Sequence, residues 1–241
     1  MIELARVTKE FDGKRKVTAL AGVDLTVERG EMVSLVGPSG SGKSTLLNLI
    51  GTLDRPTSGV VRVDGVDVAQ LTDDDRTRVR RDKIGFIFQF FNLLPSLSAL
   101  ENVALPLHLR GWDRKKAHNR AAELLDLVRL GARVEHLPDE MSGGERQRTA
   151  IARALSVYPP ILLADEPTGN LDSRTSVEII DIFQRLNEGG LTVAMVTHEH
   201  DIAQFARRVL VFRDGKIRRD EAVANRPRAA EVLKTLPTLE D

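Results

Sequence analysis

The sequence predicts an α/β protein with a mostly parallel β-sheet in its core, an antiparallel β subdomain at the N-terminal side and an inserted α-helical lobe. Short apolar runs typical of buried parallel strands alternate with helical stretches at both ends of the chain. β-like segments joined by turns fill much of the first 68 residues. Residues from about 90 to 158 lack strand patterns. We therefore expect a core at 1–89 and 159–221, a helical lobe at 90–158 and a C-terminal tail at 222–241.

The N-terminal elements begin with two β-like segments at 2–8 and 17–27, separated by the turn sequence DGK. The sequence EMVSLVGPSGSGKSTLLNLIG then predicts a buried strand, a glycine-rich loop and a helix. Residues 59–68 predict a hairpin that turns at Asp64 and Gly65. A charged helix is expected at 72–82, and the strand KIGFIFQ is expected to end at Gln89.

The second half of the chain begins with helices. Apolar residues at helical spacing predict an amphipathic helix over 113–130, namely Ala117, Ala121, Leu124, Leu125 and Val128. The later elements are expected to be the strand PILLADEP, helices near 173–187 and 199–207, the strand LTVAMVT closed by His198, and a last strand, VLVFRDGKI. The tail from Ala222 is polar, and we expect it to be loosely held.

Composition excludes several classes of protein. The 241 residues include 35 Lys and Arg and 35 Asp and Glu, and the resulting zero net charge argues against non-specific binding to nucleic acid. The chain has no cysteine, which excludes disulfides and thiolate chemistry. The charged N-terminus does not resemble a signal peptide, and no apolar run is long enough to span a membrane. We expect no direct membrane insertion, although a membrane partner could hold the protein at a membrane.

The sequence GPSGSGKST matches the phosphate-loop pattern, in which glycines let backbone N–H groups surround phosphates at a helix N-terminus. Lys43 can reach the β- and γ-phosphates, and the Ser44 hydroxyl can ligate Mg²⁺. The alternative is a chance glycine-rich turn, but a strand precedes the loop and a helix follows it. The sequence therefore predicts a nucleoside triphosphate site. Its loop residues are Gly37, Ser39, Gly40, Ser41, Gly42, Lys43, Ser44 and Thr45.

Acidic and polar residues follow the other buried strands. Asp165 and Glu166 end the strand ILLAD, where ligands bind in open α/β sheets, so Asp165 suits the Mg²⁺ shell and Glu166 suits a general base. Alone, the two acids could be a strand end with a solvated turn. Gln89 could contact the metal or the attacking water, and His198 could donate to the γ-phosphate. Alone, neither residue distinguishes a site from an ordinary strand end.

The sequence MSGGERQR places two glycines at the start of a predicted helix. Each glycine costs roughly 1 kcal/mol against alanine within a helix. Ser142 and Glu145 fit a capping box, which explains them as helix-capping residues but explains neither Gly143 nor Gly144. Bare N–H groups at a helix start suit a phosphate. Because the chain already has a phosphate loop, this second feature suggests contact with the nucleotide of a second copy.

Together these motifs resemble the ATPase subunits of ABC (ATP-binding cassette) transporters. The motifs are GPSGSGKST, Gln89, MSGGE, ILLADEP, the GNLD loop at 169–172 and His198, in the order of that family. The resemblance implies a P-loop NTPase core and an ATP-dependent head-to-tail homodimer, with each ATP between one phosphate loop and the other chain's MSGGE. It implies that Ser142 and Gly144 contact the partner's γ-phosphate and that Asp172 links the two sites. Phe11 would stack on adenine, where Tyr is commoner.

Further sequence features narrow the resemblance. FQFFNLLPSLSALENVALPL, MSGGERQR and EPTGNLD resemble the ATPases of lipoprotein-releasing and macrolide-exporting systems and the related cell-division ATPase. The resemblance implies a Mg²⁺-dependent ATPase at the cytoplasmic face of the inner membrane, bound to an integral-membrane permease. Phe90, Phe91, Leu93 and Leu94 would help to form the cleft for the permease, or alternatively a buried hinge.

Three functions follow from the resemblance. The first is export or extraction through the permease, and the second is mechanical signalling without transport, as in cell division. The third, a soluble ABC protein that acts on ribosomes or DNA, usually needs two cassettes or a coiled-coil insertion. The chain shows neither.

Overall fold

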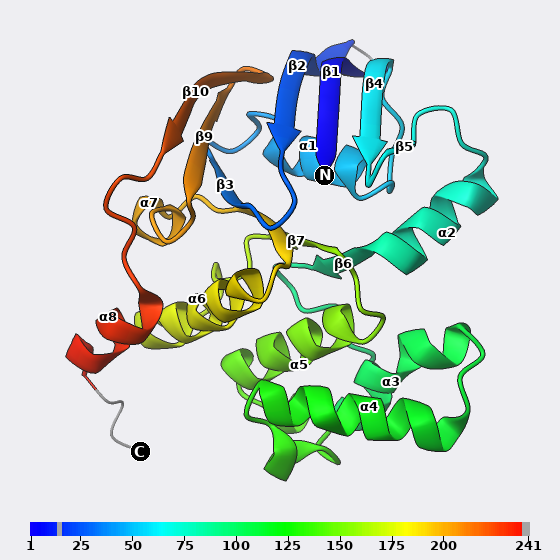
Figure 1. The fold of residues 1–241 in the computed structure, drawn as a ribbon, viewed down its shortest axis with the longest axis vertical. Coiled ribbons are helices and arrows are strands. Elements are labelled where there is room, and N and C mark those ends of the chain that lie inside the picture. The colour runs from blue at the N-terminus through cyan, green and yellow to red at the C-terminus, as the bar shows by residue number, and fades with distance from the viewer. Residues whose placement is uncertain (14–15, 238–241) are drawn as a thin grey trace.

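The computed structural model describes residues 1–13 and 16–237, and the strands of this part of the chain form two sheets (Figure 1). The four-stranded antiparallel sheet has the order β2-β1-β4-β5, formed by Ile2–Phe11 (β1), Val17–Val27 (β2), Ser58–Val63 (β4) and Val66–Asp67 (β5). The six-stranded sheet has the order β10-β9-β3-β8-β7-β6. Its strands are Met32–Val36 (β3), Ile84–Ile87 (β6), Ile161–Asp165 (β7), Thr192–Val196 (β8), Arg208–Arg213 (β9) and Lys216–Ala222 (β10).

Helices cover both faces of the six-stranded sheet. Helix α1 lies beside the antiparallel sheet in Figure 1, whereas α3, α4 and α5 form a separate group below. The helices are Lys43–Ile50 (α1), Asp73–Lys83 (α2), Ala99–Leu109 (α3), Arg114–Leu127 (α4), Gly143–Leu155 (α5), Ser173–Glu188 (α6), His200–Ala203 (α7) and Ala229–Thr235 (α8). Short 3₁₀ turns occur at Gly131–Arg133 and Pro138–Glu140.

Strand β7 shows why the sheet has a core on each face. Alternate side chains of a strand point to opposite faces, and Ile161 and Leu163 pack into the core between the two sheets. Leu162 and Ala164 pack into the other core, with α3 to α6. Because β3, β6, β7, β8 and β9 run parallel and only β10, within the described residues, pairs antiparallel in this sheet, the predicted fold class is confirmed.

Two predicted strands are too long by two residues at their C-terminal ends, because β6 ends at Ile87 and β8 ends at Val196. Neighbouring β7 pairs with β6 only as far as Ala164 and Ile87. The chain then leaves the sheet at Glu166, whose φ of 49° lies in the left-handed region. Gln89 and His198 therefore lie on loops just beyond their strands rather than at the strand ends.

The C-terminal part differs more from the prediction. The single strand expected at 209–217 is instead a hairpin, in which β9 and β10 turn at Asp214 and Gly215. The helix expected near 199–207 is shorter in the structure, because α7 has only 4 residues. The expectation of a loosely held tail is wrong for α8, because Ala229 is fully buried and its N–H donates to Gln184 Oε1 at 2.9 Å.

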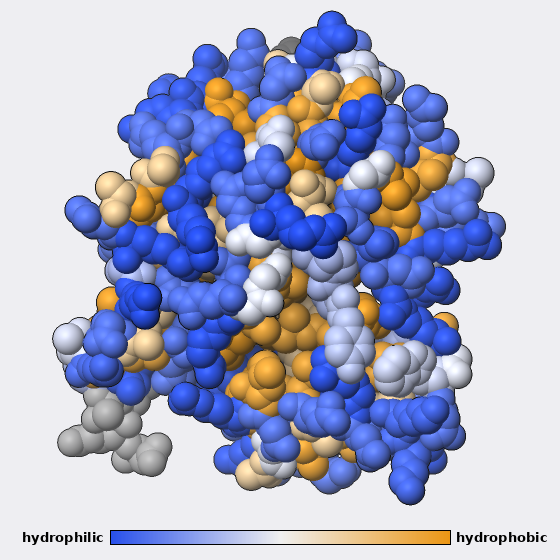
Figure 2. Space-filling view, viewed as in Figure 1, coloured by the Kyte–Doolittle hydropathy of each residue, from blue (hydrophilic) through white to orange (hydrophobic). Residues whose placement is uncertain are grey.

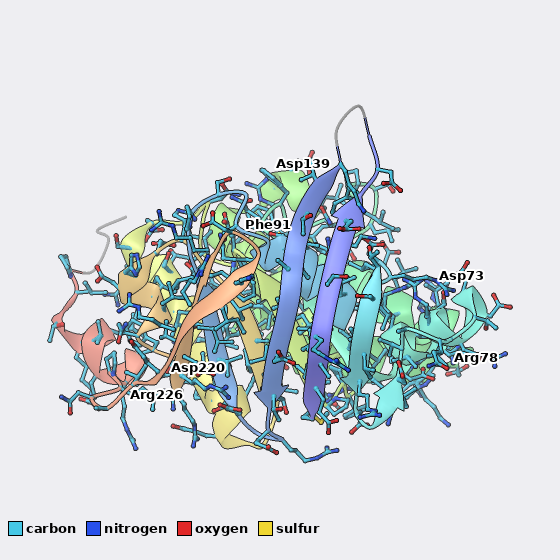
Figure 3. All side chains as sticks on the ribbon, turned by 90° about the horizontal axis from the view of Figure 1, so that it is seen from above. Asp73, Arg78, Phe91, Asp139, Asp220 and Arg226 are labelled. Carbon is cyan, nitrogen blue, oxygen red and sulfur yellow. The ribbon has the colours of Figure 1, made fainter. Side chains whose placement is uncertain are left out.

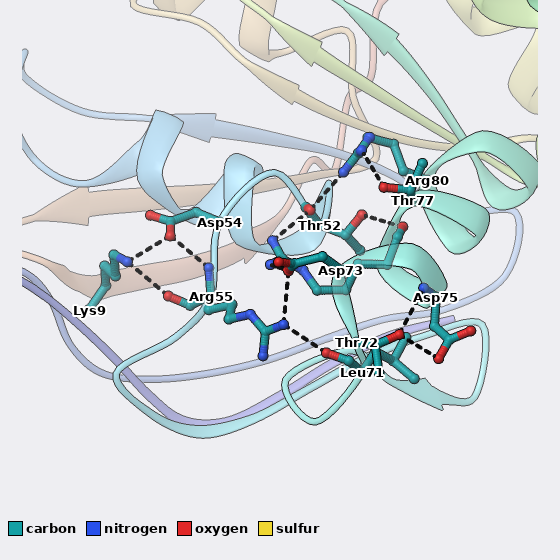
Figure 4. Close-up of polar contacts among 11 residues, drawn as sticks. Lys9, Thr52, Asp54, Arg55, Leu71, Thr72, Asp73, Asp75, Thr77 and Arg80 are labelled. Atoms are coloured by element: carbon teal, nitrogen blue, oxygen red, sulfur yellow. Dashed lines mark hydrogen bonds and ion pairs between the residues drawn. The ribbon is translucent and has the colours of Figure 1, made fainter.

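Polar contacts fasten α2 to the rest of the core (Figure 4). The carbonyl oxygen of Thr52 accepts from Arg76 at 2.8 Å and from Arg80 at 3.0 Å. Arg55 donates to Asp73 at 2.9 Å at the start of the helix. Viewed from above, α2 with Asp73 and Arg78 lies at the opposite end of the molecule from Asp220 and Arg226 (Figure 3). These contacts hold α2 in place, and this helix lines one wall of a groove.

Candidate phosphate-binding site

The glycine-rich loop lies between β3 and α1. Gly42 adopts a φ of 106°, and an added Cβ there would lie 2.5 Å from the Ala19 carbonyl oxygen, so only glycine fits. Lys43 Nζ donates to the carbonyl oxygens of Gly37 at 2.8 Å and Pro38 at 2.9 Å. Burial lowers the pKa of Lys43, although the charges of Glu166 and Asp165 oppose this shift. The loop therefore places the Lys43 ammonium group and backbone N–H groups at the start of a helix, and these groups suit a phosphate.

Asp165 lies beside the phosphate loop at the end of β7. The Ser44 hydroxyl donates to Asp165 Oδ1 at 3.1 Å. Burial raises the pKa of Asp165, the Glu166 charge adds to the rise, and the Ser44 hydrogen bond and Lys43 oppose it. A divalent cation would offset the cost of this buried carboxylate, and hydroxyl and carboxylate oxygens are ligands that Mg²⁺ takes together with phosphate oxygens. The two residues therefore fit Mg²⁺.

Glu166 is directed by its backbone. Its N–H donates to the Val196 carbonyl oxygen at 2.9 Å while its φ is 49°, which ends β7 in a sharp turn. Its carboxylate then lies 3.4 Å from His198 Nδ1, on the loop after β8. An added Cβ on Gly169 would lie 3.2 Å from Gln89 Nε2 and 3.5 Å from Glu166 Oε2. The structure thus brings Gln89, Glu166 and His198 to one edge of the sheet.

A pocket of about 210 Å³ opens over the phosphate loop. Loop residues Ser39 to Thr45 and Glu166 line it, as do Val17, Thr18 and Ala19 of β2. No sequence motif marks these three residues, and their only signal is position, since Val17 pairs with Phe11 across the sheet. Phe11 is 45% exposed, with Lys9 Nζ 4.8 Å from its ring centre. It does not line the pocket, although its strand partner does.

The start of α5 lies outside this pocket, because none of Ser142, Gly143, Gly144 and Glu145 is among the described residues that line it. The predicted capping box is present: Ser142 N–H donates to Glu145 Oε2 at 2.8 Å and Glu145 N–H donates to Ser142 Oγ at 3.2 Å. The Ser142 amide holds the pKa of Glu145 below its ordinary value. Ser142 is exposed and Gly144 is buried.

Asp172 caps α6 and also lies outside the pocket. Its carboxylate accepts from Thr175 N–H at 2.8 Å and from Thr175 Oγ1 at 2.5 Å. These two hydrogen bonds lower the pKa of Asp172, so the group stays ionised. The GNLD loop, which ends at Asp172, also contacts the loop after β6, because Asn170 Nδ2 donates to the Gln89 carbonyl oxygen at 3.0 Å.

The segment 90–94 borders a larger groove of about 610 Å³. Its wall includes Phe88 and Asn92, whereas Phe90, Phe91, Leu93 and Leu94 lie beside the groove and do not line it. The alternative, a buried hinge formed by these residues, is wrong for Phe90 and Leu94, because their side chains are 73% and 45% exposed. The face in Figure 2 is largely hydrophilic, with hydrophobic residues in small groups from its upper part through its middle to its lower part. Within the described residues, no helix is both long and apolar enough for a membrane crossing.

Sequence comparisons give close relatives. A profile described as ABC transporter matches residues 20–169. An uncharacterized ABC transporter ATP-binding protein of Methanocaldococcus jannaschii is 50% identical over 230 residues, which cover 92% of this chain and 97% of that protein. The lipoprotein-releasing system ATP-binding protein LolD 1 of Rhodospirillum rubrum is 47% identical over 218 residues, or 90% and 96%. The macrolide export ATP-binding/permease protein MacB of Syntrophobacter fumaroxidans is 49% identical over 236 residues, 96% of this chain but 33% of that protein.

The solved structures agree with these relatives. A dimer of the archaeal ATP-binding cassette in a post-hydrolysis state, bound to ADP and Pi, matches with a TM-score of 0.87 and 46% identity. The match covers 93% of this chain and 100% of that chain. A second dimeric structure of the same cassette matches with the same TM-score and 47% identity.

Proposed function

The chain belongs to the ABC transporter family as an ATP-binding domain, and we propose that it is a Mg²⁺-dependent ATPase that drives an integral-membrane permease. It works as a head-to-tail homodimer in which each ATP lies between two copies. The archaeal relative, dimeric and bound to ADP and Pi, supports both the hydrolysis and the pairing.

One observation carries the dimer proposal. The phosphate loop and Glu166 line one pocket, whereas the start of α5, with exposed Ser142 as its cap, lies outside it. A helix start that suits an anion is thus separated from the anion site of its own chain. A second copy in the opposite orientation supplies the missing helix start, so that Ser142, Gly143, Gly144 and Glu145 face the partner's γ-phosphate and Asp172 faces the partner's phosphate loop.

Each side chain has a separate role in hydrolysis. Lys43 and the loop amides bind the β- and γ-phosphates, and Phe11 stacks on adenine. Glu166, with His198 at 3.4 Å, accepts the proton of the attacking water, while His198 donates to the γ-phosphate. Ser44, Asp165 and Gln89 would hold Mg²⁺, which neutralises charge on the phosphates.

The names of two relatives support a transport role, and we infer that the ATPase acts at the cytoplasmic face of the cell membrane. One is named for lipoprotein release and another for macrolide export, the latter with its permease in the same chain. We infer that the permease exports or extracts a lipoprotein, peptide or drug-like substrate, and that it docks beside residues 90–94. The ATPase itself needs no nucleic acid.

The variant Glu166→Gln tests the catalytic assignment. Its amide cannot accept a proton, so we expect steady-state phosphate release to fall by at least about 100-fold. ATP should remain bound, and size-exclusion chromatography should show a trapped dimer. Glu123→Gln, an exposed change in α4, should keep wild-type turnover. Wild-type hydrolysis by Glu166→Gln would overturn the assignment of Glu166 as the base.

A further inference from the structure

Gln147 is a fully buried polar side chain that makes only part of its hydrogen bonds. It lies in α5, and none of its surface is exposed. Its Nε2 donates to the carbonyl oxygen of Pro167 at 2.7 Å, whereas its Oε1 has no hydrogen-bond partner within the described residues. A buried acceptor without a partner costs free energy. A methionine would fill similar space without the unpaired oxygen, so packing alone does not explain the glutamine.

The hydrogen bond of Gln147 reaches the residue that follows the proposed base. Pro167 is buried and comes directly after Glu166. The turn here is tight, because the φ of Glu166 is 49° and its carbonyl oxygen accepts from Gly169 N–H at 3.2 Å. The proline ring also fixes the φ of Pro167. A shift of the Pro167 carbonyl group therefore moves the backbone that directs the Glu166 carboxylate.

Other side chains tie the same loop to the loops that follow neighbouring strands. The buried Thr168 donates through Oγ1 to Glu199 Oε1 at 2.7 Å, on the loop after β8. Asn170 Nδ2 donates to the Gln89 carbonyl oxygen at 3.0 Å, on the loop after β6. Both contacts join the loop to the catalytic edge of its own chain. Gln147 differs from them because it comes from α5, whose start lies outside the nucleotide pocket.

Gln147 lies about one helical turn beyond the start of α5. It is four residues after Gly143, and residues at this spacing share one face of a helix. An added Cβ on Gly143 would meet Leu171 Cδ2 at 3.4 Å and the Asn170 carbonyl oxygen at 3.8 Å. This face of α5 therefore packs along the loop that follows Glu166, and Figure 1 shows α5 beside α6, the helix after that loop.

We propose that Gln147 is a positioning residue that links the start of α5 to the base of its own chain. In the head-to-tail dimer proposed above, the start of α5 faces the partner's γ-phosphate, whereas Glu166 serves the nucleotide of its own chain. A phosphate at the start of α5 thus sets the loop that carries Glu166 at the other site. Such a link couples the two sites by a free energy that acts in both directions. The proposal rests on that dimer and adds the residue that joins its two sites.

Mixed dimers with one working base test this link. In the cis dimer, one chain carries Gln147→Met with an intact Glu166, and its partner carries Glu166→Gln alone. In the trans dimer, one chain is unchanged and its partner carries both substitutions. Two affinity tags isolate each mixed dimer in ATP without a divalent cation. Phosphate release in the first turnover is then measured after addition of Mg²⁺.

The reference is a mixed dimer whose only substitution is Glu166→Gln in one chain. We expect the cis dimer to release its first phosphate about tenfold more slowly than the reference, because a misplaced base slows the reaction. The trans dimer should match the reference, since its working base keeps the Gln147 of its own chain. The ATP bound and the amount of dimer should be unchanged in both.

Gln184→Met is the matched control. Gln184 is also a buried glutamine of a helix, and its Nε2 donates to the Pro227 carbonyl oxygen at 2.9 Å, but it holds the C-terminal part of the chain. In both arrangements this variant should lower the melting temperature and leave the first turnover unchanged. Gln147→Leu removes the same hydrogen bond as Gln147→Met and repeats the comparison if the methionine variant does not fold.

A slow trans dimer with a normal cis dimer would overturn the proposal, because Gln147 would then support only the start of α5 at the partner's nucleotide. Equal rates in the two dimers, whether slow or normal, would overturn it as well, since the effect would not follow the chain with the working base. The proposed function fails on different grounds, namely absence of an ATP-dependent dimer when Glu166→Gln is the only substitution. That result would also overturn the link, because no second site would remain to be joined.

Discussion

Gly143 and Gly144 begin the same helix but meet different surroundings. An added Cβ on Gly144 would lie 2.6 Å from Thr175 Cγ2, at the start of α6, so packing within one chain already requires glycine there. An added Cβ on Gly143 would meet Leu171 Cδ2 at 3.4 Å, an ordinary contact. Only Gly143 therefore lacks a packing reason inside the chain. A close approach from outside remains the explanation we propose for it.

Gly144→Ala should lower the free energy of unfolding by about 1–2 kcal/mol, because the overpacking cost exceeds the gain in helix propensity. Adding Thr175→Ser should restore most of the loss, since serine lacks Cγ2 but keeps the hydroxyl that donates to Asp172. Urea unfolding of the nucleotide-free protein measures both effects.

Gly143→Ala is the matched control at the neighbouring position. It should leave the free energy of unfolding unchanged or raise it by up to about 1 kcal/mol. Equal destabilisation by the two alanine variants would contradict the packing explanation for Gly144.

Residues next to strand ends could be predicted from the sequence. Asp165 and Glu166 follow an apolar run, and the phosphate loop follows another, so their shared edge of the sheet was predictable from the parallel topology. The contact of Val17 to Ala19 with the phosphate loop was not, because it arises where a second sheet packs on the loop. The contacts of Arg153 with Asn92 and Phe91 were not predictable either, because they join residues 61 and 62 positions apart in the sequence.

At the scale of elements, local patterns predicted the early strands and most helices, and long-range contacts decided the rest. Helix α8 contains polar residues and lies between Pro227 and Pro237, yet Gln184 of α6 holds it in place. The side chain of Gln184 donates to the carbonyl oxygens of Phe205 and Pro227 and accepts from Ala229 N–H. The hairpin of β9 and β10 was missed although its turn, Asp214 and Gly215, is a typical hairpin dipeptide. Strand β10, KIRRDEA, is mostly polar and exposed, so no apolar pattern marked it as a strand. The Gly215 N–H donates to the Ser41 carbonyl oxygen, which ties this turn to the phosphate loop.

Asp82 joins α2 to the end of α3, because its Oδ1 lies 2.7 Å from Arg110 Nη2 and 2.8 Å from Arg81 Nε. Arg81 and Arg110 lower the pKa of Asp82 to about 2, although burial opposes the shift. Since the folded-state pKa lies below that of the unfolded chain, the stabilisation is present at neutral pH and is lost as pH falls from about 5 through 2.

Asp82→Asn should therefore lower the free energy of unfolding at pH 7 by about 1 kcal/mol, a value reduced for solvent screening because Asp82 is 40% exposed. The difference from wild type should shrink as pH falls below about 4. Urea unfolding at several pH values measures it, with the exposed change Asp139→Asn as the control. A difference that grows in acid would contradict the ion-pair explanation.

In the whole molecule, we propose that each nucleotide site takes residues from two chains. The anion-binding loop and the exposed start of α5 are both complete in local structure, yet they do not share a pocket in one chain. The archaeal relative matches this chain over 93% of its length as a dimer. Because a two-fold dimer presents the same surfaces twice, one head-to-tail arrangement completes both sites.

Cross-linking between single-cysteine chains tests this claim most directly. The natural chain has no cysteine, and Ser39 of the phosphate loop and Ser142 at the start of α5 are both exposed. Chains with Ser39→Cys and chains with Ser142→Cys, each in the Glu166→Gln background, would be mixed and treated with a short bis-maleimide. We predict a cross-link between the two kinds of chain that needs ATP. A cross-link that forms equally without ATP, or one that forms only within a single chain carrying both cysteines, would contradict a nucleotide site shared between two chains.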